Sequence, residues 1–220
     1  MIRTTLHISL LLLFAATPYR LSAQSGPWDR WDEETVSKLH TAAQTSYLGE
    51  EEKKVILFMN MARHDGPLFA ETFVEAYLQE RHMESTRAVR SLNRDLRKVS
   101  GLDPLLPEAD LTAVALGHAL ETGESGSVGH QGFNQRFKPL MGNPYTHVGE
   151  NCSYGYDQAI EIVISLLIDE GVNDAGHRKN ILNAQFNSVG VAIRPHARYR
   201  VNCVIDFGWQ NRSSLNEIPY

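Results

Sequence analysis

Three short segments place glycine beside a side chain that can bind a metal or transfer a proton. His177 lies in DAGHRKNIL, Glu150 in HVGENCSYG and His130 in SVGHQGF. Glycine lets the backbone turn sharply or approach a neighbouring segment closely. Glu150 follows His130 by 20 positions, and His177 follows Glu150 by 27. We therefore expect these three side chains to line one prearranged cleft.

The order of these segments resembles the CAP superfamily, which contains cysteine-rich secretory proteins, insect venom antigens and plant pathogenesis-related proteins. The most specific matches are GENCSYG and GHRKNIL, and VILFMNMAR and VNCVIDFG add weaker support. The resemblance extends from Glu51 to Gly208 and is to the bacterial secreted members in particular. It implies a three-layer α–β–α sandwich with a single cleft.

The resemblance also implies a cleft built from two histidines and two acids. His130, Glu150 and His177 match three of these positions by motif. The fourth is Asp169 or Glu170, and Asp169 is favoured because the bacterial pattern has an aspartate after an LLI run. An aspartate here is one methylene shorter than the glutamate of animal and plant members, which changes the reach of its carboxylate.

Two imidazoles with nearby carboxylates can bind a divalent metal, and Zn2+ suits such a mixed nitrogen and oxygen set. His130 and His177 are the predicted metal ligands, and a bound zinc would acidify a water or polarise a carbonyl. Without metal, the four groups form a pH-responsive hydrogen-bond cluster, since histidine titrates near neutrality, or they only hold loops in place. Asn151, Arg178 and Asn180 flank the cleft and are predicted to support it through hydrogen bonds.

The first 23 residues have the features of a secretory signal peptide, and we expect a secreted or periplasmic protein. Arg3 supplies the positive charge, Ile8 to Ala16 the short apolar run, and LSA before Gln24 the cleavage site. That run is too short to span a membrane, and no other stretch approaches the required length. The net charge of −5 argues against general nucleic-acid binding, which depends on neutralising phosphates.

The chain has two cysteines, Cys152 and Cys203. Because export leads to an oxidising compartment, a disulfide between them is the favoured interpretation. The alternative is two buried free thiols. Two cysteines alone do not make a four-ligand zinc site.

The chain is predicted to fold as one α+β domain. After the signal peptide, we expect an N-terminal helical extension over residues 24–50, a CAP domain over 51–210 and a tail over 211–220. Helical spacing of apolar residues predicts helices near residues 50–63, 67–80, 85–100, 108–121 and 157–169. Period-two alternation predicts an antiparallel hairpin from SVGVAIRP and YRVNCVIDF, with HVGENCSY as a third strand. Residues 122–142 are predicted to be a loop.

Regular alternation in the third strand places Glu150 and Cys152 on the same face. A cleft acid and a core cysteine would then point the same way, unless the strand bends at Gly149. The sequence leaves this open.

Two further features receive structural interpretations. Arg87, Arg90, Arg94 and Arg97 form a basic stripe that could contact an anionic surface, but a solvated helix face is the preferred interpretation. His118 lies among small apolar residues and is interpreted as a packed surface histidine rather than a ligand.

Three functions remain open. The first is a secreted, non-enzymatic domain that binds a small ligand, an extracellular protein or, as the family implies, a lipid. The second is a metal-assisted protease or amidase that uses the same cleft, and the third is a rigid scaffold. The chain has no HExxH motif, and GESGSVG lacks the setting of a nucleophile elbow.

Overall fold

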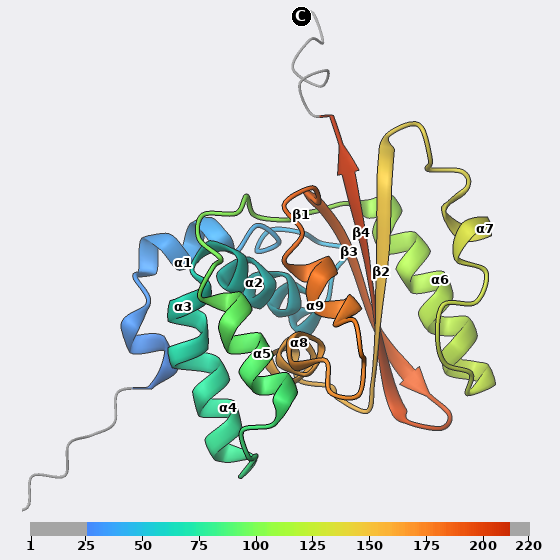
Figure 1. Cartoon of the computed structure of the whole chain (residues 1–220). Coiled ribbons are helices and arrows are strands. Elements are labelled where there is room, and N and C mark those ends of the chain that lie inside the picture. Colours follow the sequence, from blue (N-terminus) through green and yellow to red (C-terminus); the bar gives the residue numbers. More distant parts are fainter. Residues whose placement is uncertain (1–25, 212–220) are drawn as a thin grey trace, which may run out of the picture.

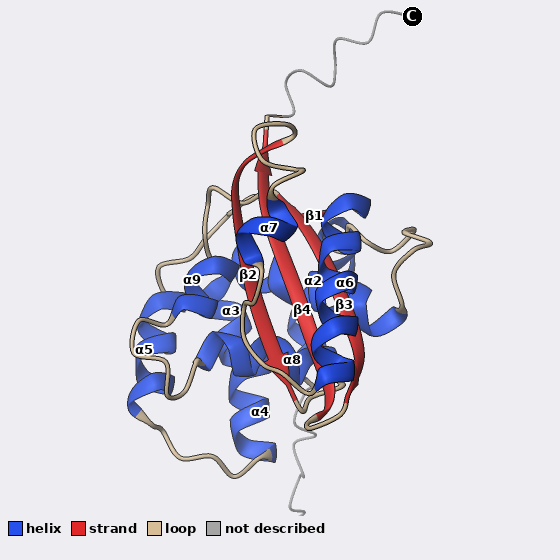
Figure 2. Ribbon diagram, turned by 90° about the vertical axis from the view of Figure 1, so that its right-hand side faces the viewer, coloured by secondary structure: helices blue, strands red, loops and turns tan. Residues whose placement is uncertain are grey.

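A four-stranded sheet with helices on both faces forms the domain, in the order β1-β3-β4-β2 (Figure 1). The computed structural model describes residues 26–211, so the predicted signal peptide and residues 212–220 of the tail lie outside the described residues. α6 packs on one face of the sheet, and α2 and α8 lie on the other (Figures 1 and 2). The α+β class and the three layers are therefore confirmed.

The helices agree with the predicted ones in place and differ at their ends. The predicted N-terminal extension contains a 3-10 turn, η1, followed by α1 and then turns up to Gly49. The predicted loop over 122–142 holds the short helix α7, and α9 was not predicted because it has fewer than two turns. The helical elements are η1 (Pro27–Arg30), α1 (Glu33–Leu39), α2 (Glu50–His64), α3 (Gly66–Phe69), the π-helical turn η2 (Ala70–Val74), α4 (Glu75–Glu80), α5 (Arg87–Leu96), α6 (Ala109–Ser125), α7 (Phe133–Phe137), α8 (Ala159–Ile168) and α9 (Gly176–Ile181).

The sheet is antiparallel except at one edge. β3 (Ser188–His196) and β4 (Arg200–Gln210) form the predicted hairpin, and β4 also pairs antiparallel with β2 (Tyr145–Tyr154). The two-residue strand β1 (Leu106–Pro107) pairs parallel with β3. β2 is thus an edge strand, and the cleft residues gather beside it.

The predicted disulfide between Cys152 and Cys203 is wrong, because both cysteines are free and buried. Cys152 pairs with Val204 across β2 and β4, whereas Cys203 pairs with Ser153. Side chains alternate between the two faces of a sheet, so this one-residue offset sends the two sulfurs to opposite faces. Cys152 packs under α6, and Cys203 lies in the main core on the other side.

The orientation of Glu150 is settled by regular pairing rather than by a bend at Gly149. The register shift in β2 lies between Tyr145 and His147, and Gly149 pairs regularly with Phe207. Glu150 and Cys152 therefore do share a face, the one covered by α6. Gly149 is required for a different reason, because a Cβ there would meet the ring of Phe186 at 3.0 Å.

Glycine also lets α6 lie directly on the sheet. A Cβ on Gly190 of β3 would come within 2.2 Å of the backbone of Leu111 and Thr112 in α6. This close approach places the end of α6, and the loop that follows it, beside β4 and β2. Among the described residues, no helix is long and apolar enough to cross a membrane.

Candidate functional site

The predicted cleft residues come from both helical layers and meet at the edge strand β2. His130 lies in the loop between α6 and α7, and Glu150 lies on β2. Asp169 ends α8, and His177 lies in the first turn of α9. The imidazole rings of His130 and His177 face each other with 6.5 Å between their centroids. The structure thus brings all four residues together as two histidine–acid pairs.

Glu150 is the most constrained member of the site. Its side chain is 1% exposed, and Oε1 lies 2.8 Å from Nδ1 of His130. The guanidinium of Arg136 donates to both carboxylate oxygens, at 2.6 and 3.0 Å. Burial by itself raises the pKa of Glu150, but the hydrogen bonds from His130 and Arg136 and the charge of Arg136 outweigh it and lower the pKa to about 2. Glu150 is therefore a carboxylate that orients the His130 ring.

Asp169 holds His177 through two hydrogen bonds. Oδ1 lies 2.6 Å from Nδ1 of the ring, and Oδ2 accepts the backbone N–H of His177 at 2.9 Å. Asp169 reaches this position because it ends α8 in the left-handed conformation, with φ at +56°. Glu170 points elsewhere and accepts from the hydroxyl of Thr86. Of the two candidates for the fourth position, it is Asp169 that contacts the cleft histidine.

Both imidazoles have Nδ1 engaged and Nε2 open. A carboxylate can only accept, so each Nδ1 is the donor, and in the neutral form of each ring the lone pair is on Nε2. Among the described residues, neither Nε2 of His130 nor that of His177 has a hydrogen-bond partner, and the two side chains are 48% and 24% exposed. They line a hollow of about 450 Å³ together with Val172, Lys179 and Asn180. The site therefore presents two oriented nitrogen donors to solvent.

The three predicted supporting residues tie the cleft segments together. Asn180 donates to the carbonyl of Glu150 and to Oδ1 of Asn151, and Asn151 donates to the carbonyl of His177. These bonds link β2 to α9 across the cleft. Arg178 points away from it, is buried, and donates to the last carbonyls of α8 and to Asp95 of α5.

Arg63, at the end of α2, fixes the segment that follows α9. It is fully buried and donates to the carbonyls of Ile181, Asn183 and Phe186. Buried carbonyls need hydrogen-bond donors, and the guanidinium of Arg63 supplies several from one side chain. The VILFMNMAR segment, which supported the resemblance only weakly, therefore anchors the chain that follows α9.

Three functional neighbours were not predicted as such. Arg136 pairs with Glu150, although its segment was predicted to be a loop. His118, interpreted as a surface residue, is only 1% exposed, with Nε2 3.9 Å from Oε1 of Glu150. Asp206 is fully buried and pairs with Glu150 in the sheet register. Burial and the charge of Glu150 raise the pKa of Asp206 well above its usual range.

Beneath the cleft, His118, Glu150 and Cys152 form a group that could hold a metal ion, with ligand atoms within 4.8 Å of one another. Each of these donors is already engaged. Nε2 of His118 bonds the carbonyl of Gly129 at 2.8 Å, Glu150 pairs with Arg136, and burial raises the pKa of the Cys152 thiol. The open Nε2 atoms above are better suited to a ligand that arrives from solvent.

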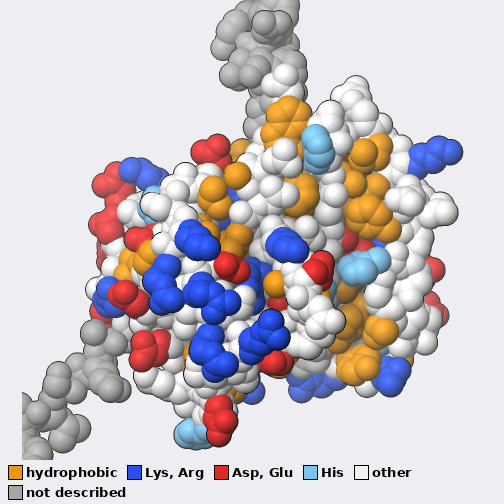
Figure 3. All heavy atoms as spheres, in the orientation of Figure 1, with side chains coloured by type: hydrophobic (Ala, Val, Ile, Leu, Met, Phe, Trp, Pro, Cys, Tyr) orange, Lys and Arg blue, Asp and Glu red, His pale blue; other side chains and the backbone are white. Residues whose placement is uncertain are grey.

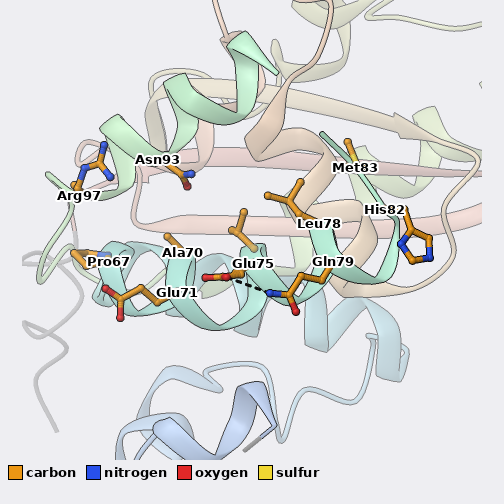
Figure 4. Close-up of a pocket in the computed structure, with 11 residues that line it drawn as sticks. Pro67, Ala70, Glu71, Glu75, Leu78, Gln79, His82, Met83, Asn93 and Arg97 are labelled. Atoms are coloured by element: carbon orange, nitrogen blue, oxygen red, sulfur yellow. Dashed lines mark hydrogen bonds between the residues drawn. The ribbon is translucent and has the colours of Figure 1, made fainter. Parts of the chain in front are cut away.

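A larger hollow of about 650 Å³ lies elsewhere, between α4 with its preceding turn and α5 (Figure 4). Its floor is apolar, with Ala70 and Leu78, and its rim includes Glu75, hydrogen-bonded to Gln79. None of the cleft residues lines it. This hollow and the histidine–acid pairs are therefore separate features.

Comparison with known proteins gives one family and several distant structures. The model of the cysteine-rich secretory protein family (CAP) matches residues 90–207, more than half of the chain. An extracellular protein with an SCP domain from Bacillus anthracis is 23% identical over 50% of this chain and 35% of its own, with a TM-score of 0.41. This chain thus spans about a third of that protein.

Two further structures show a similar level of likeness. A cysteine-rich secretory protein from Staphylococcus aureus is 19% identical over 56% of this chain and 39% of its own, with a TM-score of 0.38. Venom allergen-like protein 4 from Schistosoma mansoni is 11% identical over 74% of this chain and 91% of its own, with a TM-score of 0.45. None of the curated proteins compared with the chain matches it.

Proposed function

Because the chain belongs to the cysteine-rich secretory protein (CAP) family, as its motifs indicate, we propose that the histidine–acid pairs form a ligand-binding cleft that takes up a divalent metal. The observation that carries this proposal is the hydrogen bonding of the two imidazole rings. Each Nδ1 is bonded to a carboxylate, and each Nε2 is open toward the same hollow.

The donor set fits a metal such as zinc. Histidines that bind metals commonly donate their other ring N–H to a carboxylate, which fixes the tautomer and makes the ligand nitrogen more basic. Glu150 and Asp169 are placed to do this for His130 and His177. The two Nε2 atoms would hold the ion, and its open positions would remain for water or a ligand.

A bound zinc would supply a positive charge that polarises a ligand oxygen. The residues of the chain do the rest. Glu150 and Asp169 hold the two rings in place, and Arg136 keeps Glu150 ionised. Asn151 and Asn180 fix the distance between β2 and α9. The cleft is therefore organised before any ligand arrives.

We place this function outside the cytoplasm, in the periplasm or secreted. The signal-peptide features of residues 1–23 support export, although they lie outside the described residues. Two of the similar structures bear the descriptions "extracellular" and "secretory". The partner would then be an extracellular small ligand or protein.

The test is zinc binding by isothermal titration and elemental analysis of the purified protein. His130→Ala and His177→Ala are each expected to weaken zinc binding at least about tenfold, because each removes one of two ligands. His64→Ala is the matched control, since His64 is exposed at the end of α2 and away from the cleft. Equal affinity in all four proteins would refute the proposal. Loss of zinc only in Cys152→Ser would place the metal in the buried group instead.

The alternative function is a metal-assisted protease or amidase, which would use the same four residues. It predicts turnover of a peptide or ester panel by the zinc-loaded protein, and loss of turnover in His177→Ala with folding retained. Zinc binding without turnover would leave the binding function as the better description.

A further inference from the structure

A strongly basic surface lies beside the cleft on a chain whose net charge is −5. Figure 3 shows Lys and Arg side chains gathered over α5 and α9. These six side chains, here called the basic surface, are exposed, and none forms a salt bridge within the described residues: Arg87, Arg90, Arg94, Arg97, Lys98 and Lys179.

Neighbouring acids do not neutralise this surface. The only acid on α5 is Asp95, and it is already paired with the buried guanidinium of Arg178 at 2.9 Å. Asp169 is bonded to His177, and Glu170 to Thr86. Asp174, between α8 and α9, is the acid that remains near the cleft. Elsewhere in the described chain most exposed cations are paired, so the unpaired charge is concentrated here.

The basic surface is hollowed, and the hollow continues into the cleft. A depression of about 510 Å³ lies between α5 and the segment after α8, with Arg87 and Arg94 in its wall. It shares Ser91, Asn173 and Arg178 with a second depression, of about 600 Å³, that contains Lys98 and Lys179. Lys179 also lines the histidine cleft. A furrow therefore leads from the arginines of α5 to His177.

We propose that this furrow binds an extended acidic peptide segment and directs it into the histidine cleft. Arg94 and Lys98, which both line the furrow, are four residues apart in and just after α5, which at 1.5 Å per residue gives a spacing of about 6 Å. Same-face side chains of an extended peptide recur about every 6.6 Å. Arginine presents a planar fork that matches a carboxylate. Asp and Glu on alternate positions of a partner can therefore reach both of these cations.

A peptide is favoured over a membrane by the shape and composition of this face. Proteins that lie on anionic membranes combine basic residues with inserted apolar side chains. Near the furrow, the one exposed large apolar residue among the described ones is Val172. A concave furrow with asparagine and serine in its wall suits a single chain, whose backbone can hydrogen-bond to them.

This inference rests on the proposed binding role of the cleft, and metal-free protein separates the two. The experiment measures binding of a fluorescein-labelled peptide of about ten residues with glutamate at alternate positions, at low ionic strength and with a chelator present. Arg94→Gln/Lys179→Gln is expected to weaken binding at least about fivefold, from two exposed charge pairs of roughly 0.5 kcal/mol each. Added salt is expected to weaken wild-type binding further.

The matched control is Lys138→Gln/Arg198→Gln, which removes two exposed cations outside the basic surface. Equal weakening by both double variants would show unspecific attraction and overturn the proposal, as would absence of binding. Tighter binding to anionic vesicles or to a sulfated polysaccharide than to the peptide would also overturn it. In the NMR spectrum, peptide is expected to shift the ring signals of His177 and leave those of His64 unchanged. A peptide that shifts the ring signals of neither histidine would bind at the arginines without reaching the cleft.

Discussion

Removing Arg136 should destabilise the protein at neutral pH and much less in acid. Arg136 donates two hydrogen bonds to Glu150, whose side chain is 1% exposed. Arg136→Gln removes the charge and the paired donors and leaves a buried carboxylate held by His130 alone. Loss of one partner of a buried ion pair costs more than the pair contributes, because the remaining charge stays desolvated.

The magnitude follows from the pKa of Glu150, which is about 2 in the folded protein against an ordinary value of 4.5. At 1.36 kcal/mol per unit, this difference corresponds to roughly 3 kcal/mol of stability. The folded pKa is lowered, so this stabilisation is complete above about pH 4.5 and is lost as the pH falls from 4.5 toward 2. At pH 3 less than half remains. Arg136→Gln should therefore cost about 2–3 kcal/mol at pH 7 and less than half of that at pH 3.

The assay is urea denaturation of wild type and Arg136→Gln at both pH values, monitored by tryptophan fluorescence. Lys138→Gln removes a nearby exposed cation that forms no salt bridge and serves as the control. A loss in Arg136→Gln that is equal at pH 7 and pH 3 would refute the electrostatic reasoning. A loss below about 0.5 kcal/mol at pH 7 would show that Glu150 is held by His130 without help from the arginine.

Three further predictions concern the interior. Asp206→Asn should raise stability at pH 7, measured by urea denaturation. The pKa of Asp206 is raised in the folded protein, so the free-energy cost of burying its carboxyl group grows as the pH rises above 3.8. A lower stability of the variant would contradict this. Gly190→Ala should cost about 3 kcal/mol through collision with the α6 backbone, whereas Gly117→Ala, which meets nothing within 4 Å, should be neutral or stabilising in the same thermal melts. Denatured, unreduced protein should titrate as two free thiols from Cys152 and Cys203, and fewer would indicate oxidation.

Local patterns predicted the elements that carry the cleft. The strand alternation of SVGVAIRP and YRVNCVIDF depends on neighbouring residues only, and the hairpin forms as expected. The glycine-flanked motifs likewise predicted which residues approach one another, since His130, Glu150 and His177 do lie together. Short helices such as α9 could not be predicted in this way, because fewer than two turns give no clear periodicity of apolar residues.

Properties that depend on register and long-range packing could not be predicted from the sequence. The pairing of Cys203 with Ser153 decides that the sulfurs point apart, and a shift of one residue would reverse this. His118 looked like a surface residue because helix periodicity does not tell what covers each face. The partnership of Arg136 with Glu150 depends on where the loop after α6 crosses β2.

The position of the cleft at the edge of the sheet has a physical reason. An edge strand exposes unpaired backbone groups and invites pairing with another chain, so proteins cover such edges. Here the loop with His130 and α7 covers β2 from the α6 side, and α9 covers it from the other side. Asn180 ties α9 to the β2 backbone, because its side-chain amide donates to the carbonyl of Glu150 at 3.2 Å. This bond takes the place of one that a neighbouring strand would make. The segments that cover β2 also carry His130 and His177. The same packing therefore protects the edge strand and assembles the cleft. A variant that loosens this cover, such as Asn180→Ala, should therefore weaken zinc binding and expose β2 to hydrogen exchange together.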